Sequence, residues 1–163
     1  MKGVLDKISS YQILTNLLPG AFFGLGIKFF LGLELPTKSI GEDAVIYYFM
    51  GLIISRVGSL AVEPVLKRIG ILNFADYQDF VNASEKNGKI EILSETNNYY
   101  RSLFTCSILF PVVDWLRVFA SSNPWFFDNW KYLLLILVIL LFLLSYKKQT
   151  DYVRKRVIVT LSK

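Results

Sequence analysis

The chain has 163 residues, of which 53% are hydrophobic and only 19% are charged, whereas soluble domains usually carry about a quarter charged residues. It contains one cysteine and no histidine, which excludes an intrachain disulfide, Ser-His-Asp or Cys-His catalysis and a histidine-ligated metal. The net charge is +5, and in a membrane protein the location of such a charge matters more than its sum.

The apolar residues are concentrated in runs long enough for transmembrane helices, each of which needs about 20 mostly apolar residues. We therefore predict an all-α integral membrane bundle of four transmembrane helices, forming a single membrane domain over residues 1–163. The expected spans are approximately residues 13–33, 44–66, 102–120 and 130–146.

A longer polar stretch, residues 67–101, separates the second span from the third. Within it, the segments FADYQDFVNASE and IEILSETNNYYRS have helical character, and Asn87-Gly88 between them favours a turn. We predict a small cytoplasmic helical hairpin here, with its second helix running into the third span. The last residues, 147–163, form a basic tail.

The distribution of Lys and Arg predicts the orientation. Most of them fall in the N-terminal segment, in residues 67–101 and in the tail, whereas the opposite side has only Lys28, Lys38 and Lys131. Loops rich in Lys and Arg stay in the cytoplasm. Both termini are therefore expected to be cytoplasmic, in a multi-pass membrane protein.

Four charged residues lie inside the expected spans: Arg56, Glu63, Asp114 and Arg117. A charge at the bilayer centre costs at least about 2.5–3.5 kcal/mol, so each requires a partner or a function. From their depths we predict an ion pair between Arg56 and Asp114. The alternatives are an i,i+3 pair between Asp114 and Arg117, or charges that line or gate a passage.

Small residues favour close helix packing in the first two spans. Gly20 and Gly24 form a G-x-x-x-G pair, and Gly51, Ser55 and Ser59 continue the same spacing in the second span. Such spacing lets helix backbones approach closely, either within one subunit or between subunits. Near the end of the second span, Pro64 is expected to kink or end the helix.

Basic residues are expected to ring the cytoplasmic membrane surface, where they would contact anionic lipids, an anionic ligand or a cytoplasmic partner protein. These residues are Lys67, Arg68, Arg101, Lys147, Lys148, Arg154, Lys155 and Arg156. No cofactor, metal or direct nucleic-acid binding is expected, because the acidic residues of the polar stretch match no ligand pattern.

The segments YQILTNLLPG, GLIISRVGSLAVEPVLKR, FADYQDFVNAS and NNYYRS resemble a pattern in small, largely uncharacterised bacterial inner-membrane proteins. The resemblance covers most of the chain as far as Arg101. It implies a role in antiphage defence, where small membrane proteins act in two ways. Some recruit or sense a partner, as the membrane subunit of the Kiwa system does, and others permeabilise the membrane, as transmembrane effectors do.

Three functions follow as expectations. The first is a non-enzymatic, homo-oligomeric membrane subunit that senses or signals to a partner through its cytoplasmic hairpin and tail. The second is a pore-forming, membrane-disrupting effector, with the intramembrane charges lining or gating a passage. The third, a membrane enzyme, is disfavoured by the lack of histidine and of a carboxylate cluster with metal spacing.

Overall fold

The computed structural model describes the backbone of residues 2–35 and 39–162, and the side chains of residues 13–35 and 39–162. Lys38, expected on the side opposite the termini, lies outside the described residues, as do the side chains of Lys2 and Lys7. The described part of the chain is helical, with no strand.

Seven helical elements follow one another within the described residues. They are α1 (Lys2–Leu31), α2 (Ile40–Val57), the π-helical turn η1 (Gly58–Val62), α3 (Glu63–Arg68), α4 (Tyr77–Lys86), α5 (Lys89–Ser122) and α6 (Pro124–Leu161). Four stretches of these helices are long and apolar enough to cross a membrane, as expected of a multi-pass membrane protein. They are Ile13–Leu31, Ile40–Arg68, Lys89–Ser122 and Pro124–Leu161.

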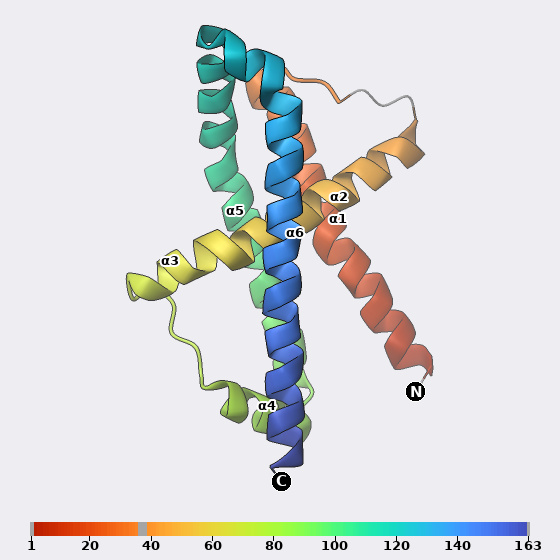
Figure 1. The fold of residues 1–163 in the computed structure, drawn as a ribbon. Coiled ribbons are helices and arrows are strands. Elements are labelled where there is room, and N and C mark those ends of the chain that lie inside the picture. Colours follow the sequence, from red (N-terminus) through yellow and green to blue (C-terminus); the bar gives the residue numbers. More distant parts are fainter. Residues whose placement is uncertain (1, 36–38, 163) are drawn as a thin grey trace.

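Elements α2, η1 and α3 form one uninterrupted rod that crosses the long helices α5 and α6 obliquely (Figure 1). A rod of 29 residues is about 43 Å long at 1.5 Å per residue. That length exceeds a hydrocarbon core of about 30 Å, and a tilted helix accommodates the excess.

Both ends of the described chain lie at the same end of the molecule, together with α4, whereas the α5–α6 connection lies at the opposite end (Figure 1). The connection is tight because Asn123 ends α5 and also caps α6. Its side chain accepts a hydrogen bond from the Phe126 backbone N–H at 3.2 Å, and Pro124 occupies the first turn.

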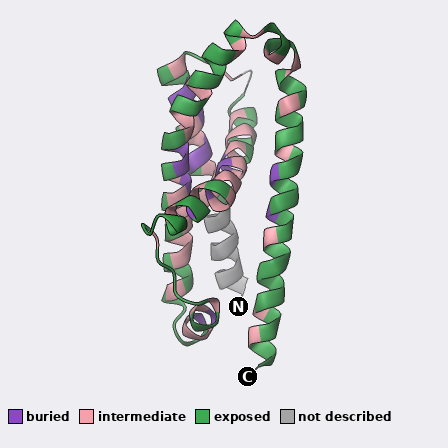
Figure 2. Ribbon diagram, turned by 60° about the vertical axis from the view of Figure 1, so that its left-hand side comes forward, coloured by how far each residue is buried: buried purple, intermediate pink, exposed green. Residues whose placement is uncertain are grey.

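Burial is concentrated where α1, α2 and α5 meet, and α6 is exposed along most of its length (Figure 2). Only 6% of the most apolar window of α6 is buried within the subunit, although its mean hydropathy of 2.0 is the highest of the four. Exposed apolar surface on this scale requires a hydrocarbon environment or another protein surface.

Candidate functional site

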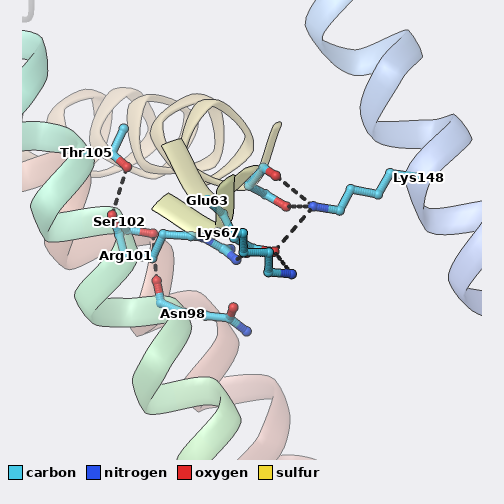
Figure 3. A network of polar contacts seen from close by, with 8 residues as sticks. Glu63, Lys67, Asn98, Arg101, Ser102, Thr105 and Lys148 are labelled. Carbon is cyan, nitrogen blue, oxygen red and sulfur yellow. Dashed lines mark hydrogen bonds and ion pairs between the residues drawn. The ribbon is translucent and has the colours of Figure 1, made fainter. Parts of the chain in front are cut away.

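The carboxylate of Glu63 is enclosed by basic side chains from several helices. Glu63 is the first residue of α3 and only 6% exposed. Arg101 of α5 donates a hydrogen bond from Nη1 to Glu63 Oε2 at 2.6 Å, and Lys67, one turn further along α3, places Nζ 3.0 Å from Oε1 (Figure 3). An ionised carboxylate removed from water is costly unless cations compensate it, and these two supply that compensation.

Lys148 of α6 is a third cation beside the Glu63 carboxylate. Its Nζ donates hydrogen bonds of 2.7 Å to both the carbonyl oxygen and the hydroxyl oxygen of Ser59, and it lies 3.9 Å from Glu63 Oε1 (Figure 3). We call Ser59, Glu63, Lys67, Arg101 and Lys148 the Glu63 cluster. The cluster joins the α2–η1–α3 rod to both α5 and α6.

Pro64 explains why the Ser59 carbonyl is free to bind Lys148. In an α-helix this carbonyl would accept from the N–H of Glu63, but that N–H donates to the Gly58 carbonyl instead, in the i→i+5 pattern of a π-helix. The i+5 residue for Ser59 is Pro64, which has no N–H. A carbonyl that is partly removed from water needs a donor, and the Lys148 ammonium supplies it.

Gly58 explains how α5 comes close enough to place Arg101 against Glu63. A Cβ atom at Gly58 would lie 2.6 Å from the Thr105 hydroxyl oxygen and 3.3 Å from Cγ of Arg101. The Thr105 hydroxyl donates to the carbonyl of Arg101 on its own helix at 2.8 Å. The Nε of Arg101 is buried and has no hydrogen-bond partner within the described part of the chain.

The structure contradicts the predicted pairing of Arg56 with Asp114. Asp114 pairs instead with Arg117 on the same helix, at 3.3 Å, and Arg117 also donates to the carbonyl of Leu31 at the end of α1, at 2.9 Å. The i,i+3 alternative is therefore the one observed. Arg117 pairs with Asp114 within one turn of α5, whereas Arg56 of α2 is half-buried and forms no ion pair within the described residues.

The glycines predicted to pack closely lie between α1 and α2. A Cβ atom at Gly20 would overlap the backbone carbonyl of Tyr47, and one at Gly51 would overlap the backbone of Asn16. A Cβ atom at Gly24 would meet the Tyr47 ring. Ser55 is half-buried on the same rod. These contacts are all made within one subunit.

The predicted basic ring divides into residues that form ion pairs and residues that do not. Lys67, Arg101 and Lys148 belong to the Glu63 cluster, and Arg156 lies 3.8 Å from Glu85 of α4. The remaining members are exposed and form no ion pair within the described residues: Arg68, Lys147, Arg154 and Lys155. The i,i+4 spacing of Glu63 and Lys67 was visible in the sequence, but no pattern in the sequence predicted that Arg101 and Lys148 also lie beside Glu63.

In the part of the chain that the structure describes, no three acidic, cysteine or histidine side chains are grouped so that they could hold a metal ion. The chemistry of the Glu63 cluster is thus that of charge compensation between helices. Comparison with family models, with curated proteins and with solved structures gives no match for this chain.

Proposed function

We propose that the chain is a non-enzymatic, oligomeric subunit of a bacterial inner membrane. It would pass a signal between a cytoplasmic hairpin, formed by α4 and the first turns of α5, and the membrane-spanning helices. The resemblance of its sequence to small defence-associated membrane proteins supports a place in antiphage defence.

The observation that carries the proposal is the continuity of α6. Beyond its apolar stretch, this one helix contacts α4, where the Tyr77 hydroxyl donates to the Tyr152 carbonyl at 3.3 Å and the two rings lie 5.9 Å apart. One turn earlier, Lys148 joins the Glu63 cluster. A force applied to α4 or to the end of α6 therefore acts on the point where three helices meet.

A pore-forming effector, the alternative expected from the sequence, is less well supported. It requires Arg56, Glu63, Asp114 and Arg117 to line one passage. Glu63 is enclosed by cations at the level of Arg101, and Asp114 lies 13 positions further along α5, about 20 Å away at 1.5 Å per residue. Within one subunit, the four charges form two separate groups.

To test the proposal, the chain is expressed in bacteria, alone and together with the genes adjacent to it. Membrane potential is measured with a fluorescent dye, and phage plating efficiency is measured on the same strains. We expect no depolarisation by the chain alone. With its neighbours, we expect protection that Lys148→Gln removes and Lys147→Gln retains, at equal abundance in the membrane. Depolarisation by the chain alone that disappears in Arg56→Ala would favour the pore, and equal protection by both lysine variants would contradict the signalling proposal.

A further inference from the structure

One face of α6 carries mostly apolar side chains at alternating intervals of three and four residues, and we call this face the α6 stripe. The stripe passes without interruption from the apolar span into the basic tail: Ile139, Leu143, Tyr146, Thr150, Val153 and Val157. The same spacing extends it backwards to Ile136 and Tyr132. Its apolar members are all at least 50% exposed (Figure 2). An average interval of 3.5 residues is the repeat of helices that pair as coiled coils.

The α6 stripe faces away from the rest of the subunit. Leu141 and Ser145 are the buried residues of α6, and Lys148 binds Ser59 of the rod. Leu143 lies two residues from both Leu141 and Ser145, which places it about 160° away from each of them around the helix axis. The stripe is therefore free to contact a surface outside the subunit.

Lipid can cover only the part of the α6 stripe that lies in the membrane. Val153 and Val157 follow Lys147 and Lys148, where the apolar run has ended, and they are 54% and 50% exposed. Apolar side chains exposed outside the bilayer favour contact with another protein. A single partner for both parts of the stripe must cross the membrane and continue beyond it as a helix.

The α6 helix of a second copy meets these requirements. Copies of one chain insert into the membrane with the same orientation, so their α6 helices run parallel and present the same residues at the same depth. Lys147 and Arg154 flank the stripe on one side, and in a parallel pair this flank faces Phe142 and Gln149 of the other helix. These two cations therefore meet uncharged side chains and not each other.

The polar member of the stripe within the tail is also compatible with burial. The Thr150 hydroxyl donates to the Tyr146 carbonyl of its own helix at 2.9 Å, so it would enter an interface without an unsatisfied donor. The exposed halves of the eight stripe side chains amount to roughly 400–500 Å² per copy. A specific interface needs about 1,000 Å² in total, so two stripes supply most of that area before their flanking residues are counted.

We propose that two copies of the chain pair through the α6 stripe, with the helices parallel and in register from Tyr132 to Val157. The interface would be about 38 Å long at 1.5 Å per residue, and its tail portion would hold the two copies together outside the bilayer. This inference rests on the oligomeric part of the proposed function and specifies its contact surface.

The test is disulfide crosslinking of the full chain in membranes. The buried Cys106 is first replaced by serine, and Val153→Cys, Val157→Cys or Lys155→Cys is then introduced. Lys155 is an equally exposed control in the same turns, about 160° around the helix from the stripe. After oxidation with copper phenanthroline, we expect at least about fivefold more crosslinked dimer at Val153 and Val157 than at Lys155, because a disulfide requires closely facing Cβ atoms.

Equal crosslinking at Val153 and Lys155, or none at Val153 and Val157, would overturn the proposed interface. The protein mass of the wild type in mild detergent then separates this failure from that of the proposed function. A mass of two or more chains without crosslinking at the stripe means that the oligomer forms through another surface. A strict monomer overturns both the interface and the oligomeric proposal.

Discussion

At the scale of single residues, Glu63 determines the polar chemistry of the bundle. Among the described residues, its carboxylate is the one that lies within 4 Å of cations from α3, α5 and α6 together: Lys67, Arg101 and Lys148. Buried ion pairs often contribute little net stability, but removing one partner leaves the others uncompensated and is strongly destabilising. Glu63 is therefore more important for holding these helices together than its single charge suggests.

Replacing Glu63 by glutamine should lower the free energy of unfolding by about 3–5 kcal/mol, because Arg101 and Lys148 would keep their charges without a counter-ion. Thermal unfolding in detergent measures the change. The control is Glu34→Gln, whose partner Lys28 lies 3.1 Å away in an exposed pair, so that we expect a loss of at most about 1 kcal/mol. Equal effects of the two substitutions would contradict the role given to Glu63.

Gly51 tests the close contact between α1 and α2. Gly51→Ala places a Cβ atom against the backbone of Asn16, and overpacking of this kind typically costs about 1–3 kcal/mol. Gly41→Ala, on the same helix, meets only the Ser39 hydroxyl oxygen at 3.9 Å. That control should be neutral or slightly stabilising, since alanine favours a helix by about 1 kcal/mol over glycine. A Gly51→Ala protein as stable as the wild type would show that the helices are not packed at this point.

At the scale of elements, the π-helical turn connects a sequence feature to a contact between helices. Pro64 removes one backbone donor, η1 shifts the hydrogen-bonding register, and the Ser59 carbonyl accepts from α6 instead of from its own helix. From the sequence, Pro64 was expected to kink or end the helix. The helix does not end there but continues to Arg68, with the π turn immediately before the proline.

A double-mutant cycle between Pro64→Ala and Lys148→Gln tests this connection. Alanine restores a backbone N–H that can bond to the Ser59 carbonyl, so that carbonyl no longer depends on Lys148. We expect Lys148→Gln to cost at least 0.5 kcal/mol less in the Pro64→Ala background than in the wild type, as is typical of coupled neighbours. Additive changes in unfolding free energy would mean that the proline and the lysine act independently.

At the scale of the whole molecule, hydrophobicity alone predicted four membrane-spanning helices, since each apolar run is long enough to be recognised by composition. The Glu63 cluster was not predictable in the same way. Its members come from three helices far apart in the sequence, and their meeting depends on the glycine at Gly58 and on the register shift at η1. Arg56 and Asp114 were paired by depth alone, which gives no information on which way a side chain faces.

The exposed apolar surface of α6 makes a prediction about assembly. Gly20 and Gly51 are used within the subunit, so we expect an oligomer to form through another surface, and α6, with 6% of its most apolar window buried, offers one. The proposed function predicts that the protein mass in mild detergent, corrected for bound detergent, is at least twice that of one 18.7 kDa chain. Light scattering during size-exclusion chromatography measures it, and a strict monomer would contradict the oligomeric proposal.

The most direct test of the account compares two neighbouring lysines of α6. Lys148 is bound to Ser59 and lies beside Glu63, whereas Lys147 is exposed and forms no ion pair within the described residues. Each is replaced by glutamine, and the thermal unfolding midpoint is measured in the same detergent. Lys148→Gln replaces the ammonium donor of the Ser59 carbonyl by a shorter, uncharged amide, a loss of about 1–3 kcal/mol, which corresponds to about 2–12 °C for a chain of this length. We predict that decrease for Lys148→Gln and a change below about 1 °C for Lys147→Gln, since isolated surface charges contribute little; equal midpoints for the two variants would contradict the central role of the Glu63 cluster.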